Sequence, residues 1–520
     1  MRCTILLSSI ILLIGCNTRP EIESFDPPNI VFILADDFGV GDIQAHYPEN
    51  KIPTPHLDRL VSQGMSFSDA HSGSAVCTPT RYGLLTGRYC WRTPLQEWVL
   101  ACYEPPLIPA DELTLPTFLQ NQGYQTACIG KWHLGWNWQG EKQSRMEEVP
   151  NVLKKERWIF DQPIPEGPTT RGFDYYFGTH VPNFPPFTFI ENDRIVTQPT
   201  DTYHYDPDEG VVMPKTFDGA PMAPSWKFDQ ILPSITSRAV EYIHQQAKQE
   251  DPFFLYFSMT SPHEPVVPSH RFKGKSGIAP IADFVMETDW SVGQIMQALE
   301  DADVLHNTLV IFTADNGHSG YTGWQELIDA GHLPSGPFRG HKADIWEGGH
   351  RVPFVVRWPE KVAAGGKNSS MLCLTDVFGT IAELLDDALP GDAAEDSFSF
   401  LAAMLGEDEP TPRKSMVHHS VHGEFAYRQG PWKLVFQMPT AQRTTSRGKE
   451  TIRRLYHLEN DVAEKMDVAS EHPDIVQNMT AALEAIVDNG RSTPGRKLTN
   501  DVSVDFRTIQ TRRWMAEAPR

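Results

Sequence analysis

Four short apolar runs rich in β-branched residues recur along the first two thirds of the chain, and stretches with helical spacing separate them. They are residues 29–37 (NIVFILADD), 125–133 (QTACIGKWH), 252–263 (PFFLYFSMTSPH) and 307–317 (NTLVIFTADNG). This alternation predicts an α/β fold in which helices cover both faces of a mostly parallel sheet. Each run ends in charged or metal-capable residues, and ligands of open α/β sheets bind outside the carboxyl ends of the strands. The pattern therefore predicts one shared site at those ends.

The pattern changes near residue 410. Residues 425–437 and 452–460 resemble antiparallel strands, and residues 472–490 (HPDIVQNMTAALEAIVDNG) predict an amphipathic helix that ends at Gly490. The apolar face of this helix holds Ile475, Val476, Met479, Leu483, Ile486 and Val487. We therefore predict a small α+β domain over residues 410–490.

The remaining boundaries follow from composition. Residues 29–409 form the predicted large domain. Within it, residues 135–230 are rich in proline, tryptophan and acids and show little periodicity, which predicts an irregular insertion around the site. Residues 491–520 are polar and predict an irregular tail.

The N-terminus predicts export. Arg2 precedes the apolar residues 4–15 (TILLSSIILLIG), a run too short to span a membrane and typical of a signal peptide. Leu13-Ile14-Gly15-Cys16 resembles a bacterial lipobox, so we expect cleavage before Cys16, acylation of Cys16 as a membrane anchor, and a tether over residues 17–28. The resulting protein would be a lipoprotein of the periplasm or cell surface. An ordinary secretory signal with an incidental cysteine is the alternative.

Composition narrows the function classes. The chain has 520 residues, with 45 Lys and Arg against 67 Asp and Glu, and a formal net charge of −22, which argues against nucleic-acid binding. An anionic substrate must then be met by a local group of cations. Cysteine spacing is not that of structural zinc, while Cys90 and Cys102 could form a disulfide in an oxidising compartment.

Two of the predicted strands end in the same way. Residues 29–37 end in Asp36 and Asp37, and residues 307–317 contain Asp315 and Asn316, each pair followed by a nearby glycine. Carboxylates gathered at neighbouring strand ends repel one another unless a cation lies among them, and oxygen ligands favour calcium or magnesium over zinc. Capping of the following helices is the alternative for each pair taken singly.

Cationic residues follow the other strands. Lys131 and His133 are two residues apart and lie on one face of an extended strand. His263 ends a third strand, and Lys342 lies in a glycine-rich segment, although each taken alone is as compatible with a structural or solvated role. A metal with two lysines, an arginine and two histidines would form a site able to offset charge on a sulfuryl or phosphoryl group.

The arginine comes from the most specific motif in the chain. Cys77-Thr78-Pro79-Thr80-Arg81, followed by YGLLTGRY, is similar to the signature of the sulfatase family, in which this cysteine is converted to formylglycine. The resemblance covers nearly the whole chain after the signal segment. It implies an alkaline-phosphatase-like α/β fold with a small C-terminal domain, and one bound calcium ion, with magnesium possible. It also implies a formylglycine-generating maturation enzyme as a partner.

The resemblance also assigns roles to residues. Asp36, Asp37, Asp315 and Asn316 would hold the metal together with residue 77. Arg81 and Lys131 would steady the formylglycine, and His133 would hydrogen-bond one of its hydroxyls. His263 and Lys342 would bind the sulfate, with His263 a candidate acid for the leaving oxygen. One hydroxyl of the hydrated aldehyde attacks sulfur, and the second allows sulfate to be expelled as the aldehyde re-forms.

We therefore expect a sulfatase acting on a sulfated carbohydrate, similar to arylsulfatase A and N-acetylgalactosamine-6-sulfatase. A phosphate or phosphonate ester hydrolase and a non-catalytic glycan-binding lipoprotein are the alternatives. Substrate choice is expected in residues 135–230 and 318–341. The candidate sugar-contacting residues are Trp136, Trp138, Trp226 and Trp324, with Arg171, His180 and His204 for a carboxylate or second sulfate. His350, where an aliphatic residue is expected, could also contact substrate, and residues 396–399 (DSFS) depart from the family pattern as well.

Overall fold

The computed structural model describes residues 26–140, 158–206, 217–407, 411–439 and 448–509. The predicted signal peptide, Cys16 and most of the tether lie outside the described residues. Among the helices that are described, none combines the length and apolar character needed to cross a membrane.

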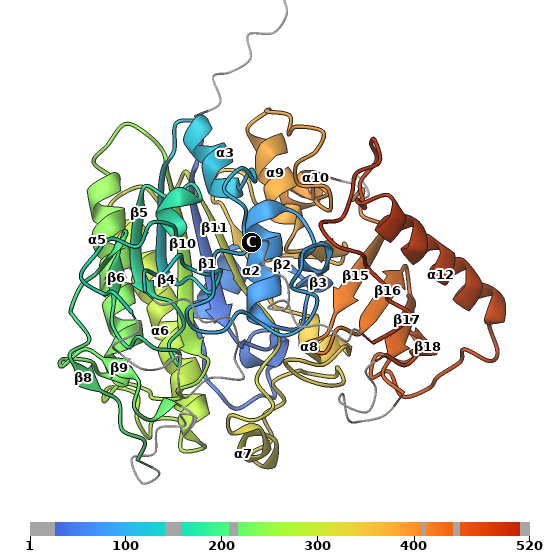
Figure 1. Ribbon diagram of the computed structural model, residues 1–520, viewed down its shortest axis with the longest axis horizontal. Helices are drawn as coiled ribbons and strands as arrows, with labels where there is room; N and C mark the ends of the chain where they lie inside the picture. The colour runs from blue at the N-terminus through green and yellow to red at the C-terminus, as the bar shows by residue number, and fades with distance from the viewer. Residues whose placement is uncertain (1–25, 141–157, 207–216, 408–410, 440–447, 510–520) are drawn as a thin grey trace, which may run out of the picture.

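A ten-stranded sheet forms the centre of the molecule (Figure 1). Its strands are β1 (Asn29–Asp36), β2 (Met65–Phe67), β4 (Gln125–Lys131), β5 (Tyr175–Thr179), β6 (Ile190–Glu191), β7 (Arg194–Ile195), β10 (Phe253–Pro262), β11 (Thr308–Ala314), β12 (Phe354–Arg357) and β13 (Gly366–Asn368). Their order is β13-β2-β12-β11-β1-β10-β4-β5-β6-β7. The central strands β11, β1, β10, β4 and β5 are parallel, and almost all of their residues are buried. Their carboxyl ends therefore lie at one edge.

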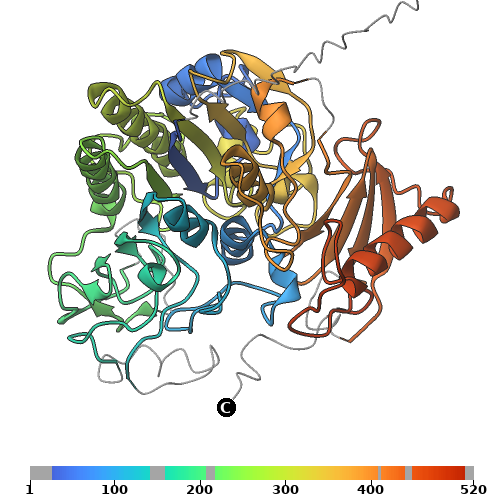
Figure 2. The same cartoon turned by 90° about the horizontal axis from the view of Figure 1, so that it is seen from above.

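Helices cover both faces of this sheet (Figure 2). The helices are α1 (Pro55–Gln63), α2 (Cys77–Thr86), α3 (Leu115–Asn121), α5 (Ile231–Gln246), α6 (Pro280–Asp301), α7 (Trp324–Asp329), α8 (Glu347–His350), α9 (Asp376–Leu384) and α10 (Leu401–Leu405). α1, α5 and α6 pack together on one face, where α5 and α6 contact β10. α2, α3 and α9 pack together on the other face.

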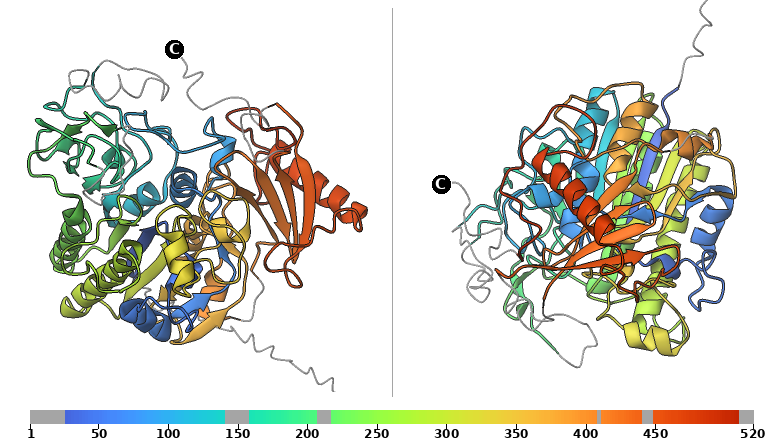
Figure 3. Two further views of the ribbon diagram at one scale, coloured as in Figure 1. Left: turned by 90° about the horizontal axis from the view of Figure 1, so that it is seen from below. Right: turned by 90° about the vertical axis from the view of Figure 1, so that its right-hand side faces the viewer.

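A second, antiparallel sheet follows in the chain. It consists of β15 (Ser415–His419), β16 (Phe425–Gln429), β17 (Trp432–Gln437) and β18 (Ile452–His457), in that order. Helix α12 (Pro473–Asp488) lies on its outer side (Figure 3). Its buried residues include Met479, Leu483 and Val487, and Gly490 follows it at φ 65°, as the sequence pattern predicts. Two small pairs complete the strands: β3 (Ala70–His71) with β14 (Leu372–Cys373), and β8 (Asp201–Thr202) with β9 (Pro221–Met222).

The four predicted strands are confirmed as β1, β4, β10 and β11, and the predicted architecture of a large mixed sheet with a smaller α+β unit is confirmed as well. The expectation for residues 135–230 is wrong in one respect, because β5 within them pairs with β4 and extends the main sheet. β5 has only five residues, and its pattern is too short to separate a strand from a loop.

Candidate functional site

The four strand ends predicted to share a site lie side by side. β11, β1, β10 and β4 are neighbours in that order and run parallel, so Asp315, Asp36, His263 and Lys131 emerge at the same edge. The carboxyl end of β4 also needs a close chain approach. Gly130 has φ 120°, and a Cβ atom there would lie 1.8 Å from the Ser258 carbonyl oxygen of β10. Glycine thus allows β4 to end at Lys131 directly beside β10.

Three buried carboxylates at this edge are each paired with a buried cation. Lys131 Nζ lies 3.0 and 2.8 Å from the two carboxylate oxygens of Asp36. Lys342 Nζ donates to Asp37 Oδ2 at 2.7 Å. Arg81 Nη2 donates to Asp315 Oδ2 at 2.7 Å and lies 3.5 Å from Asp36 Oδ1. We call these residues the strand-end cluster: Asp36, Asp37, Arg81, Lys131, Asp315 and Lys342.

The carboxylates of the strand-end cluster compete for this positive charge. Burial opposes ionisation of Asp36 and Asp37, but Lys131 acting on Asp36 and Lys342 acting on Asp37 outweigh it, and both pKa values lie below the usual range. Burial and the charge of Asp36 instead raise the pKa of Asp315 to about 7. Crowding with Asp36 therefore makes Asp315 the hardest of the three carboxyls to ionise.

The oxygen donors of the site fit a hard cation. Asn316 donates through Nδ2 to Asp37 Oδ1 at 2.8 Å, while its Oδ1 is buried without a partner among the described residues. Ligand atoms of Asp36, Asp37 and His263 lie within 4.8 Å of one another. A crowded carboxylate set with an unpartnered amide oxygen is the donor chemistry that calcium and magnesium prefer.

Cys77 begins helix α2, and Arg81 lies one turn later on the same face. Arg81 ties this helix to two strands, because its Nη1 donates to Ser258 Oγ on β10 and its Nη2 reaches Asp315 after β11. Burial raises the pKa of the Cys77 thiol, so the unmodified side chain stays protonated and is a poor nucleophile. Nucleophilic chemistry at this position requires a changed side chain. Ser258 has no motif of its own and was not found from the sequence.

His133 and His263 each have one nitrogen fixed by a backbone carbonyl. His133 Nε2 donates to the Leu100 carbonyl at 2.9 Å, which leaves its buried Nδ1 as an acceptor without a partner in the described chain. His263 Nδ1 donates to the Glu264 carbonyl at 2.6 Å, and its Nε2 lies 3.8 Å from Asp37 Oδ2. Burial and Lys342 lower the pKa of His263 to about 4, so this imidazole is neutral near pH 7.

Backbone strain gathers at the same place. Asp37 has φ 65°, His133 has φ 54°, and Ala343, next to Lys342, has φ 80°. Side chains other than glycine rarely adopt this conformation, and it persists only where the surrounding structure holds it. The observation is typical of a functional site rather than of simple helix capping.

Several residues predicted to contact substrate lie elsewhere. Trp136 and Trp138 are 1% and 2% exposed within the main core, so their prediction as sugar platforms is wrong. Arg171 turns inward and donates to the Ile108 carbonyl, and His204 is exposed beside Asp218. Trp226 packs on Phe189 and Phe228. These aromatic residues pack the insertion, because burying rings is its main source of stability.

Two predicted residues stay near the site. His180 packs edge-to-face against His133, with ring centroids 5.8 Å apart. Burial lowers its pKa to about 4, so it is not the cation that we expected for a second sulfate. Trp324 on α7 is half-buried, and its ring centroid lies 6.0 Å from that of His318. His318 is two residues beyond Asn316 in the chain. Cys90 and Cys102, which could have formed a disulfide, are both free.

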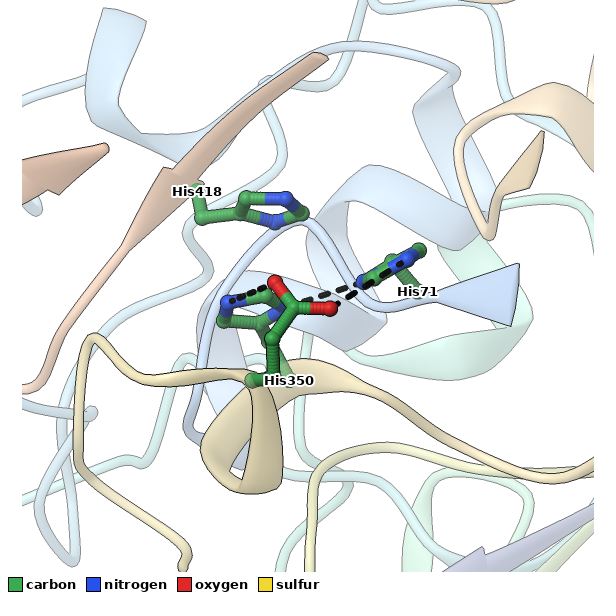
Figure 4. Close-up of side chains that lie close together, drawn as sticks. His71, His350 and His418 are labelled. Carbon is green, nitrogen blue, oxygen red and sulfur yellow. Dashed lines mark hydrogen bonds and ion pairs between the residues drawn. The ribbon is translucent and has the colours of Figure 1, made fainter. Parts of the chain in front are cut away.

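His350 belongs to a different cluster, so the expectation that it contacts substrate is wrong. His71, Glu347, His350 and His418 are buried together between α8, β3 and β15 (Figure 4), and we call them the histidine cluster. His350 and His418 stack with centroids 3.6 Å apart, and His71 Nδ1 lies 3.0 Å from His350 Nδ1. By distance alone these four side chains could hold a metal.

A lysine ammonium already supplies the cation of the histidine cluster. Lys433 Nζ lies 3.0 Å from His350 Nε2, 3.1 Å from Glu347 Oε1 and 2.8 Å from Glu464 Oε1. The ammonium thus hydrogen-bonds to His350 and Glu347 and forms an ion pair with Glu464. The proton of His350 then resides on Nδ1 and is donated to His71 Nδ1, and His71 Nε2 lies 2.9 Å from Asp69 Oδ1 and 3.0 Å from Arg428 Nη1. The cluster is an ion-paired connection of α8 and β3 to the four-stranded antiparallel sheet.

Known proteins match this chain over most of its length. The sulfatase family model matches residues 28–388, which contain the whole strand-end cluster. An N-acetylgalactosamine-6-O-sulfatase of Bacteroides thetaiotaomicron is 34% identical over 521 residues, covering 92% of this chain and 98% of the relative. Arylsulfatase A of Homo sapiens is 30% identical over 515 residues, covering 90% and 91%.

The fold agrees with these relatives. A structure solved in work on the metabolism of multiple glycosaminoglycans by Bacteroides thetaiotaomicron superposes with a TM-score of 0.76 at 30% identity, covering 89% of this chain and 99% of that one. The alkaline-phosphatase-like fold is thereby confirmed. Because the family match, the relatives and the fold all span most of the chain, this protein belongs to the sulfatase family and hydrolyses sulfuric esters.

Proposed function

We propose that this sulfatase removes 6-O-sulfate groups from N-acetylgalactosamine or a related sugar of a sulfated glycan, with residue 77 acting as a formylglycine. The observation that carries the proposal is the strand-end cluster. Arg81, Lys131 and Lys342 bring three buried cations to the same sheet edge as a protonated Cys77 thiol. The relatives named for N-acetylgalactosamine-6-sulfate and for multiple glycosaminoglycans support the choice of sugar.

The metal of the site would be one calcium ion, with magnesium as the alternative. Asp36, Asp37, Asp315 and Asn316 would hold it together with residue 77, because the crowded carboxylates and the unpartnered Asn316 oxygen match its donor chemistry. When bound, the ion offsets negative charge on the sulfate and makes a neighbouring hydroxyl more acidic.

Residue 77, as a hydrated aldehyde, has two hydroxyls. One loses its proton to solvent and attacks sulfur, the ester S–O bond breaks, and the sugar oxygen takes up a proton and leaves as a hydroxyl. His263 is the candidate donor of that proton, and its Nε2 must first be protonated because the free imidazole is neutral. The second hydroxyl then loses its proton, the bond between the aldehyde-derived carbon of residue 77 and the sulfate oxygen breaks, and the aldehyde re-forms. His133 Nδ1, a buried acceptor without a partner among the described residues, is the candidate base.

The test of this proposal combines mass and turnover. Peptide mass spectrometry of protein made with a formylglycine-generating enzyme should find an aldehyde at position 77. Release of sulfate should be measured on N-acetylgalactosamine-6-sulfate and on aryl sulfate, and release of phosphate on aryl phosphate, with Cys77→Ala as control. Full activity with an unmodified thiol would overturn the formylglycine mechanism, and faster turnover of aryl phosphate would favour a phosphate ester hydrolase.

Export and anchoring are part of the same proposal. The lipobox-like Leu13-Ile14-Gly15-Cys16 supports lipidation at Cys16 and a location in the periplasm or at the cell surface. Several acyl chains hold a protein on a membrane firmly, whereas one gives marginal binding. Extraction of the native protein should therefore require detergent, and recovery in the soluble fraction without detergent would count against the anchor.

A further inference from the structure

Glu264 is an acid in a place where the sulfatase reaction alone offers it no role. It follows His263 directly, and its carboxyl interacts electrostatically with Lys342, Asp37 and Lys131. Lys342 is a cation that would meet the sulfate, and Lys131 is one that would steady residue 77 beside it. A carboxylate beside them weakens the attraction for an anion, so its presence needs a compensating interaction.

The Glu264 side chain is half-buried and held in one orientation. Asn183, which is 3% exposed, donates through Nδ2 to Glu264 Oε1 at 2.8 Å. The second oxygen, Oε2, makes no hydrogen bond within the part of the chain that the structure describes. Burial raises the pKa of Glu264, as expected for a carboxyl with too few donors around it. One oxygen is thus fixed by protein, and the other remains as an acceptor.

The neighbouring segment also offers acceptors rather than cations. His180 Nε2 donates to the Ala101 carbonyl, which leaves Nδ1 as an acceptor, and Asn183 Oδ1 is buried without a partner among the described residues. Burial keeps His180 neutral. This side of the site is therefore suited to hydrogen-bond donors and unsuited to a second anionic group.

We propose that Glu264 accepts a hydrogen bond from a free ring hydroxyl of the sulfated sugar, at C3 or C4, and that Asn183 is the positioning residue for it. This inference rests on the proposed function, since it requires a sugar ester. A hydroxyl donates to Glu264 Oε2, whereas a second sulfate at the same position would have no proton to donate and would face the carboxylate. The enzyme should therefore prefer a sugar that carries one sulfate and free hydroxyls at C3 and C4.

The experiment compares kcat/KM on N-acetylgalactosamine-6-sulfate, its 3-deoxy and 4-deoxy analogues, and the 4,6-disulfate. The unaltered enzyme should prefer the first substrate to at least one deoxy analogue and to the disulfate by about 10-fold to 100-fold, because a hydrogen bond to a charged group is lost. Glu264→Gln should reduce these ratios several-fold. Asn183→Leu should shift the same ratios in the same direction by less, a change that a merely structural residue would not cause. Glu383→Gln, an exposed acid on α9, is the matched control and should leave the ratios unchanged.

Calorimetry with Cys77→Ser protein gives a readout independent of turnover. Glu264→Gln in that background should weaken binding of the monosulfated sugar more than binding of the relevant deoxy analogue. If the unaltered enzyme releases sulfate but Glu264→Gln loses activity equally on all sugars, or changes none of the ratios, the role of Glu264 is overturned and the proposed function stands. Absence of both binding and sulfate release on every sugar would overturn the proposed function, and the inference with it.

Discussion

The strand-end cluster and the histidine cluster both combine carboxylates with lysine and arginine side chains, and they differ in how the charges are paired. The first pairs Asp36, Asp37 and Asp315 with Arg81, Lys131 and Lys342. In and around the second, Asp69, Glu347 and Glu464 pair with Arg351, Arg428 and Lys433. Both are buried, and both bring metal-capable side chains within 4.8 Å of one another.

The difference lies in what is left over. In the strand-end cluster the pKa of Asp315 is raised to about 7, and the hard oxygen Asn316 Oδ1 has no partner in the described chain. In the histidine cluster, Lys433 and Arg351 overcome burial to hold the pKa of Glu347 well below its usual range. Burial raises the pKa of Glu464, but its Oε1 lies 2.8 Å from the Lys433 ammonium, and the atoms left without any such cation are the ring nitrogens of His418. Proximity of ligand atoms alone therefore does not identify a metal site. The useful signs are crowded carboxylates and unpartnered donors of the right hardness.

The largest expected effect is on catalysis in the strand-end cluster. Asp315→Asn keeps the shape of the side chain but removes a charge that Arg81 and the proposed metal both need. Turnover should fall on the order of 10⁴-fold or more, as for members of a catalytic unit, at temperatures where a thermal melt shows that the variant is folded. Sulfate release and metal content by mass spectrometry would measure this. Retention of most activity both in this variant and after exhaustive chelation would leave the cluster a structural one.

The next effect is on stability in the histidine cluster. Lys433→Met removes the ammonium and leaves Glu347 and Glu464 buried without it. Loss of one partner of a buried ion pair costs about 3–5 kcal/mol, so the free energy of unfolding should fall by that amount. Denaturant titration measures it, with Lys361→Met, an exposed lysine, as control. An unchanged midpoint would contradict our account of Lys433.

The histidine cluster should also make stability depend on pH. Burial, with Arg351, lowers the pKa of His71 to about 4, and burial holds the pKa values of His350 and His418 well below the ordinary value. The unfolded chain binds these protons as the pH falls below about 6.5 while the native chain does not, so stability is lost between about pH 6.5 and pH 4. One such histidine accounts for about 2–3 kcal/mol. Unfolding at several pH values should give a shallower slope for His71→Gln, and an equal slope would remove His71 from this role.

A smaller effect is expected at the border of the strand-end cluster. Trp324 is half-buried and packs near His318 and His341, so it is the described tryptophan from our predicted set that remains a candidate sugar contact. Trp324→Ala should raise KM for a sulfated oligosaccharide about 2-fold to 10-fold, with less change in kcat. Steady-state kinetics on oligosaccharide and aryl sulfate would separate these parameters. Equal losses on both substrates would place the sugar contact elsewhere.

The smallest expected effect is on the stability of the histidine cluster, and it tests directly whether that cluster is a metal site. Both ring nitrogens of His418 are buried without partners among the described residues, while the ring stacks on His350. His418→Phe keeps the stacking and removes polar atoms that cost energy when buried, so stability should be unchanged or rise by up to about 1 kcal/mol. A clear loss of stability together with loss of a bound transition metal would show that the histidine cluster is a metal site after all.

The sequence by itself determined the strands and the chemistry at their ends. The runs ending at Asp36, Lys131, His263 and Asp315 are long and apolar enough to predict strands, and parallel strands bring such ends to one edge. The Cys77 motif then indicated the family. These features are local or follow from a general rule of sheet topology, so they could be read without coordinates.

Only the tertiary structure decided which of the remaining polar and aromatic residues join that edge. His350 pairs with His71 and Lys433, which lie 279 and 83 residues away, and this pairing draws it into the histidine cluster. Trp136 becomes core because the insertion folds onto the sheet, and Glu264 becomes an oriented acceptor because Asn183, 81 residues away, holds it. Whether a buried polar or aromatic side chain binds substrate or only packs depends on partners brought by distant segments, and no local pattern records those partners.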